Sequence, residues 1–78
     1  MNQIKQKSIE QYFADHGVVD PDAKAQLLPQ ITQLIYDRNI YVVKAEKEDD
    51  QFKKEQITKD AEEMDKRIEQ IIKDSTKK

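Results

Sequence analysis

The chain of 78 residues has no cysteine, and it contains only one histidine and one glycine. Without cysteine a disulfide framework is excluded, and a single histidine leaves no set of ligands with the spacing of a zinc site. One glycine cannot build a glycine-rich phosphate loop, and the histidine has no serine placed to act as a nucleophile beside it. These absences predict no catalytic, cofactor-binding or metal-binding residues. We therefore expect a protein that is not an enzyme and has neither a cofactor nor a small-molecule substrate.

Long apolar runs are also missing, because the longest covers only residues 40–43. A membrane span needs roughly 18 such residues, so no membrane partner is expected. The 14 basic and 16 acidic side chains are interspersed and create no strong field of one sign, so we do not expect nucleic acid as the partner. The prediction is a small, slightly acidic, cytoplasmic protein. Its lysine-, isoleucine- and glutamine-rich usage is compatible with a bacterium of low GC content or with a phage.

The supply of core residues is lean, since 36% of the chain is apolar and 38% is charged. Cores of this size usually contribute only about 3–5 kcal/mol and need disulfides, a metal or association with another chain in addition. Disulfides are excluded because there is no cysteine, and the single histidine leaves no set of metal ligands. It therefore predicts that the chain associates with itself or with another protein.

Composition divides the chain near residue 43. Both prolines, the glycine and four of the five aromatic residues come before residue 44, and a charged sequence with sparse apolar positions follows. We predict an all-α fold with an N-terminal helical hairpin or core over residues 1–43, a long charged amphipathic helix over 44–74 and a frayed tail over 75–78. The long helix is expected to carry a short coiled-coil-like seam.

The first helix is predicted over residues 2–15. His16 and Gly17 follow it as a stop signal in which glycine takes the left-handed conformation, and Val18 is then placed to touch Phe13. A short linker leads to Asp20 and Pro21, the N-cap and first residue of a second helix. The first two helices are thus neighbours in a hairpin or helix-turn-helix corner.

The course of the second helix is open at two places. Pro29 removes a backbone hydrogen bond and predicts a kink or a break near Leu28. Residues 39–43 are compatible with helix, turn or strand, and helix is favoured because no partner strand exists. One helix could then run from Gln30 to Asp74, with the charged residues 46–50 as a candidate hinge. The densest part of the core is expected at Leu27, Leu28, Ile31, Leu34 and Ile35.

The clearest pattern lies in the second half, where five apolar residues recur at intervals of four, three, four and three. This spacing is typical of a helix packed along another helix. These residues are Ile57, Ala61, Met64, Ile68 and Ile71. Together with Phe52 and Ile72, they are the predicted partner-binding residues.

The favoured function is protein binding, as an adaptor, an inhibitor or an assembly factor that forms a homodimer through the apolar stripe at residues 57–71 or binds another protein there. A transcription or replication regulator is the alternative. It would use the corner at Asp20 to bind DNA, with Lys24 and Arg38 as its basic residues, and would dimerise through the C-terminal helix. A third possibility is a monomer in which the C-terminal helix folds back on the first two helices. Neither the partner nor the biological process follows from the sequence.

Overall fold

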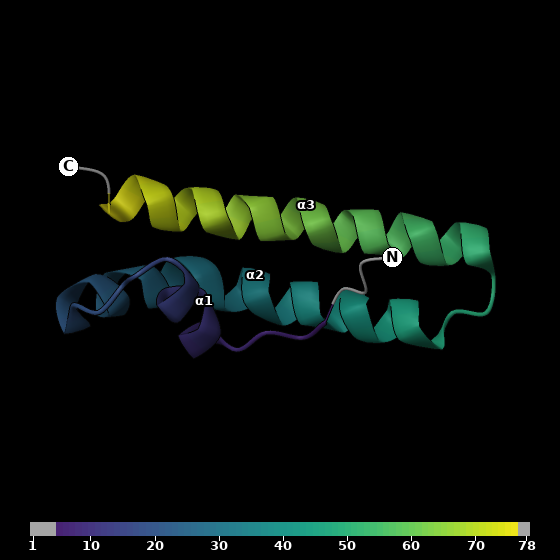
Figure 1. Cartoon of the computed structure of the whole chain (residues 1–78), viewed down its shortest axis with the longest axis horizontal. Helices are drawn as coiled ribbons and strands as arrows, with labels where there is room; N and C mark the ends of the chain where they lie inside the picture. The colour runs from purple at the N-terminus through teal and green to yellow at the C-terminus, as the bar shows by residue number, and fades with distance from the viewer. Residues whose placement is uncertain (1–4, 77–78) are drawn as a thin grey trace.

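The computed structural model describes residues 5–76 and contains three helices in that range, with no strand among them. The helices are α1 (Ile9–Asp15), α2 (Pro21–Lys47) and α3 (Gln51–Thr76). Helices α2 and α3 lie side by side and antiparallel along the long axis, and α1 lies across α2 (Figure 1). This confirms the all-α fold, with an N-terminal helical pair followed by a long C-terminal helix.

Helix α1 begins later than predicted, because Ser8 caps it. The Ser8 hydroxyl accepts from the Gln11 amide at 3.2 Å, and the Gln11 side chain accepts from the Ser8 amide at 3.0 Å. This reciprocal pair satisfies two backbone groups that a helix start otherwise leaves free. The expected helix over residues 2–15 is therefore wrong for residues 5–8, and residues 2–4 lie outside the described range.

The predicted stop after α1 is confirmed. Gly17 has a φ of +67°, the left-handed conformation that glycine adopts at no steric cost. The Val18 amide donates to the Phe13 carbonyl at 2.8 Å, and the Gly17 amide donates to Ala14 at 3.2 Å. These two bonds form a Schellman motif, and Val18 and Phe13 are both buried in the core.

Helix α2 begins as expected and continues through both ambiguous places. The Asp20 side chain accepts from the Asp22 amide, and Pro21 is the first helical residue. Pro29 lies inside the helix without breaking it, and residues 39–43 are helical. The apolar residues on both sides of the proline therefore belong to one helix.

A turn at residues 48–50 separates α2 from α3, so the expectation of one helix over 44–74 is wrong. Glu48 is extended, with φ −79° and ψ 125°, and the Asp50 carboxylate accepts from the Phe52 amide at 2.9 Å. This reversal falls in the charged stretch singled out as a hinge. It lets the apolar stripe of α3, which we call the α3 seam (Ile57, Ala61, Met64, Ile68 and Ile71), pack on α2 of the same chain instead of remaining in water. Ser75 and Thr76 belong to α3, and residues 77–78 of the expected frayed tail lie outside the described range. The division into units at residue 43 stays a prediction, although that residue lies inside α2.

All three helices contribute to one core. From α2 it includes Leu27, Ile31 and Ile35, whereas Leu34 is only partly buried and Leu28 is 40% exposed. The remaining members come from the other elements, namely Tyr12, Phe13, Val18, Ile68 and Ile72. Ile68 and Ile72 share this cluster with residues of α1 and α2. The C-terminal half of α3 therefore folds back and packs on the first two helices of the same chain.

Candidate functional site

The predicted partner-binding residues of α3 are divided between the core and the surface of the chain. Ala61, Ile68 and Ile72 are fully buried, and Ile71 packs against the core cluster. Ile57 and Met64 are half-buried, and Phe52 is 79% exposed. The structure thus brings most of these residues onto their own chain and leaves Phe52 at the surface. Their role in binding a partner stays a prediction.

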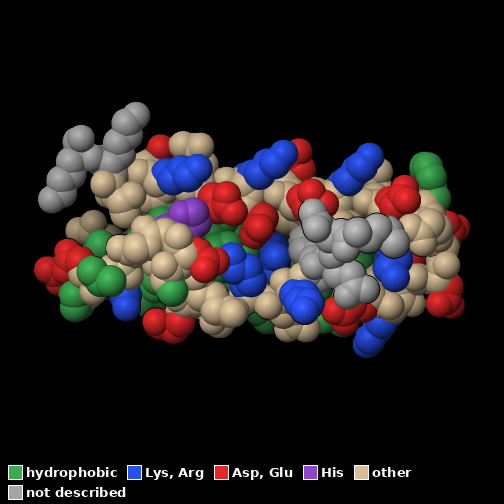
Figure 2. Space-filling model, viewed as in Figure 1, with side chains coloured by type: hydrophobic (Ala, Val, Ile, Leu, Met, Phe, Trp, Pro, Cys, Tyr) green, Lys and Arg blue, Asp and Glu red, His purple; other side chains and the backbone are tan. Residues whose placement is uncertain are grey.

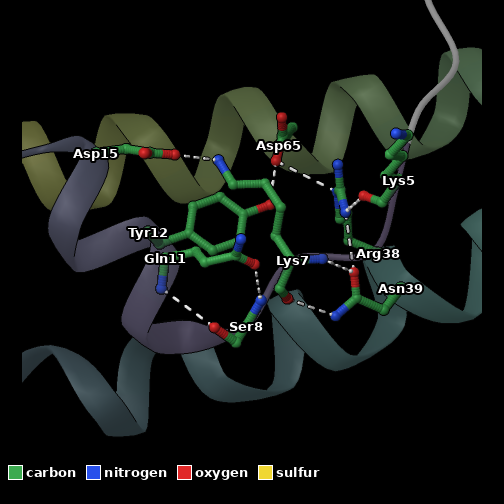
Figure 3. A network of polar contacts seen from close by, with 9 residues as sticks. All are labelled: Lys5, Lys7, Ser8, Gln11, Tyr12, Asp15, Arg38, Asn39 and Asp65. Atoms are coloured by element: carbon green, nitrogen blue, oxygen red, sulfur yellow. Dashed lines mark hydrogen bonds and ion pairs between the residues drawn. The ribbon is translucent and has the colours of Figure 1, made fainter.

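A buried polar network lies where the segment before α1 meets the two long helices (Figure 3). Arg38 is its centre, with 3% of its surface exposed. The guanidinium donates to the Lys5 carbonyl and, at 2.9 Å, to the Asn39 side chain, and its Nε lies 3.4 Å from the Asp65 carboxylate. The Tyr12 hydroxyl donates to the same carboxylate oxygen. These contacts join α1, α2 and α3 at one point.

Asn39 holds the N-terminal segment against α2. Its side-chain oxygen accepts from the Lys7 amide at 3.1 Å, and its side-chain nitrogen donates to the Lys7 carbonyl at 2.8 Å. The side chain therefore replaces the backbone partners that an extended segment lacks. This pair, together with the bond from Arg38 to the Lys5 carbonyl, holds the segment against α2.

The Tyr12 hydroxyl is suited to donating a hydrogen bond and not to proton transfer near neutral pH. Burial, followed by its hydrogen bond to Asp65, raises the pKa of the hydroxyl above its ordinary value, and the charge of Arg38 opposes this only in part. The raised pKa of Tyr12 can add to the free energy of unfolding. This contribution is fully present below the ordinary pKa of tyrosine and is lost as the pH rises through the pKa in the folded chain. The network has the chemistry of a structural clamp.

Lys7 crosses the face of the Tyr12 ring, with its Nζ 4.2 Å from the ring centroid, and reaches the Asp15 carboxylate at 2.6 Å. That hydrogen bond, and next the charge of Lys7, hold the pKa of Asp15 below its ordinary value. The contribution of this pair to the free energy of unfolding is present above the ordinary pKa of aspartate. It is lost as the pH falls through the lowered pKa of Asp15 in the folded chain.

We therefore expect Lys7→Met to raise the pKa of Asp15 toward the ordinary value of an aspartate, because the hydrogen bond and the charge that lower it are removed. A pH titration of the Asp15 carboxyl carbon by NMR measures this. Lys5→Met is the matched control, because Lys5 enters the network through its backbone carbonyl. An Asp15 pKa that does not move in the Lys7 variant would show that the pair is absent in solution.

The surface of α2 that faces away from α3 carries a second apolar pattern. We call it the outer face of α2: the apolar residues Tyr36, Ile40 and Val43, followed by the lysine Lys47, at intervals of four, three and four. Tyr36 is 62% exposed, and Ile40 and Val43 are half-buried. The α2 residues buried in the chain lie on other positions of the helix, for example Ile35 and Val42.

An open groove of about 420 Å³ runs along this outer face. Its lining combines an aromatic ring and two aliphatic side chains with lysines at one end, and the segment before α1 forms one wall. The lining residues are Gln6, Tyr36, Asn39, Ile40, Val43, Lys44 and Lys47. An apolar floor with a polar rim is the composition of surfaces that bind other proteins. The sequence pattern did not predict this face, because its 4-3-4 spacing overlaps the stronger pattern of the buried residues.

Basic and acidic side chains alternate over the face of the molecule seen in Figure 2, without a field of one sign. Arg38, one of the two basic residues on which the DNA-binding alternative relied, is buried against Asp65. Across residues 5–76, His, Asp and Glu side chains nowhere form a group of three that could hold a metal ion. No helix in that range is long and apolar enough to span a membrane.

In comparisons with protein-family models, with curated proteins and with solved structures, nothing matches this chain.

Proposed function

We propose that the chain is a small non-enzymatic protein-binding protein and that it binds through the outer face of α2. One observation carries the proposal: Tyr36 is 62% exposed beside Ile40 and Val43 on a single helix face. Apolar residues at such intervals are the anchors by which helices bind in grooves or along other helices. Tyrosine is also enriched among the residues that dominate binding energy.

The location of the face supports this choice over the α3 seam. Ile68 and Ile72 already pack in the core, so a partner that needed them would first have to open the hairpin at the cost of the core. The outer face of α2 contributes no residue to the core cluster, so a partner there would leave the core intact. A partner there would remove apolar surface from water at about 25 cal/mol per Å² without loss of existing packing.

Roles as an adaptor, an inhibitor or an assembly factor all fit this proposal, and the cytoplasmic location remains an expectation from the sequence. The DNA-binding regulator is not favoured by any feature of the described surface. With Arg38 engaged by Asp65 and the Lys5 carbonyl, only Lys24 remains of the basic residues named for phosphate contact.

Site-specific photo-crosslinking tests the proposal. We expect a benzophenone amino acid at position 36 to form covalent adducts with protein in the source cells, and the same group at the exposed Gln70 on α3 to form none. Adding Ile40→Lys to the position-36 variant should abolish the adducts, because it places a charge in the contact. If position 36 yields no adduct beyond those of position 70, the outer face of α2 is not a binding surface.

A further inference from the structure

We propose that the outer face of α2 binds the outer face of α2 in a second copy of this chain, with the two helices antiparallel around a two-fold axis. The proposal rests on the function proposed above and names the partner of that same surface. It differs from a dimer through the α3 seam, since each copy keeps its own α2–α3 hairpin intact.

Helix geometry determines which residues would meet in such a pair. Two helices with a 4-3-4 pattern pack in layers when they run antiparallel, so Ile40 of one copy lies beside Val43 of the other, and the reverse. The layers at both ends then place Tyr36 beside the aliphatic stem of Lys47 from the second copy. A lysine stem can cover an aromatic ring while its charge stays in water.

Two charged residues beside the outer face of α2 favour a second copy of the chain in the antiparallel direction. Asp37 and Lys44 lie seven residues apart, so they occupy the same flank of the outer face, two turns from each other. In an antiparallel pair this flank faces the same flank of the second chain. Asp37 of each chain therefore lies beside Lys44 of the other. The two-fold axis therefore creates two opposite-charge pairs. A parallel pair would place this flank against the opposite flank, where Thr32 and Asn39 lie, and would form neither pair.

Among residues 5–76, the partners of these two side chains are weak. Asp37 accepts a hydrogen bond from the Gln33 side chain at 3.0 Å, and the Lys44 ammonium lies 5.7 Å from the Tyr41 ring centroid. No ion pair within residues 5–76 uses either group. Both are thus free to exchange a surface contact for an intermolecular pair at little cost.

The size of the face implies weak association. From Tyr36 to Lys47 the helix rises about 16 Å, and a helix is about 10 Å wide, which falls short of the about 800 Å² per partner of a stable complex. We therefore expect a reversible dimer whose population depends on protein concentration. This agrees with a chain that also folds as one hairpin.

Charge exchange at the two positions, followed by sedimentation equilibrium over a concentration series, tests the arrangement. Asp37→Lys alone places lysine against Lys44 twice, and Lys44→Asp alone places aspartate against Asp37 twice. Each variant should dimerise about tenfold more weakly than the parent. An equimolar mixture of the two should recover the parent's association, because every contact is then between opposite charges. The doubly exchanged chain, Asp37→Lys with Lys44→Asp, should recover it as well.

Asp60→Lys is the matched control, since it changes the net charge by the same amount at an exposed site on α3 and should leave the dimer unchanged. Circular dichroism confirms that each variant keeps its helices. A parent chain that stays monomeric, a dimer that ignores the exchanges, or single variants that mixing does not rescue would each overturn the proposal.

The crosslinking experiment separates this failure from failure of the proposed function. Adducts at position 36 with twice the mass of the chain support self-pairing. Adducts with another protein would overturn self-pairing and leave the protein-binding function standing. The absence of adducts would contradict both.

Discussion

Substitution of Ile68 by aspartate is expected to unfold the chain rather than change its association. Ile68 is fully buried in the cluster shared by all three helices. Losing that burial costs about 1.5–3 kcal/mol, and an unpaired carboxylate among apolar side chains costs several more. The total exceeds the about 3–5 kcal/mol that a core of this size provides. Far-UV circular dichroism at 25 °C should show that most of the helical signal is lost.

Phe52→Asp is the matched control, because Phe52 belongs to the same helix and to the same predicted contact set but is 79% exposed. It should change the free energy of unfolding by less than about 0.5 kcal/mol, as surface substitutions do. Ile68→Ala should fall between the two, with a loss of about 2–5 kcal/mol. A folded Ile68→Asp chain with the parent's helicity would show that α3 does not pack on α2.

Removing Arg38 is expected to release the segment before α1 as well as to destabilise the fold. In Arg38→Met the Asp65 carboxylate loses its ion-pair partner, and the Lys5 carbonyl loses its donor. Breaking a buried pair from one side costs about 3–5 kcal/mol, and we expect about 2–3 kcal/mol because the Asp65 side chain is 24% exposed. Urea unfolding measures this loss. Hydrogen exchange of the Lys7 amide, which donates to Asn39, should accelerate at the same time.

A double-mutant cycle with Asp65→Asn tests whether the two residues act as a pair. Asparagine keeps the shape of Asp65 and still accepts from Tyr12, but it removes the charge. If the pair is formed, the double variant should be more stable than the sum of the single losses predicts, by about 1 kcal/mol or more. Strictly additive losses would contradict the ion pair.

Local signals in the sequence were enough to predict the secondary structure where a single residue decides it. Gly17 must adopt a positive φ after a helix, and Asp20 followed by Pro21 starts one, so both boundaries of the corner were predicted correctly. The start of α1 was missed because the apolar pattern continues through Ile9 and hides the cap at Ser8. The turn at 48–50 was located as a hinge but not as a reversal, since no glycine or proline marks it.

The buried network could not be predicted from periodicity. Arg38 occupies a position on the buried side of α2, between Ile35 and Val42, yet a hydrophobic pattern reads a charged residue as exposed. Asp65 is likewise one acid among many on α3. Only the antiparallel packing of the two helices brings these opposite charges together and shows that each has a partner.

The central claim is that α3 packs on α2 of its own chain, which leaves the outer face of α2 available. Isotope-filtered NOE spectroscopy on a mixture of labelled and unlabelled chains tests it most directly, because the filter retains only contacts between different molecules. We predict NOEs between the methyl groups of Ile68 and those of Ile31 or Ile35 in the unfiltered spectrum, and none of them in the filtered one. If these NOEs pass the filter, the seam joins two chains and the account is wrong.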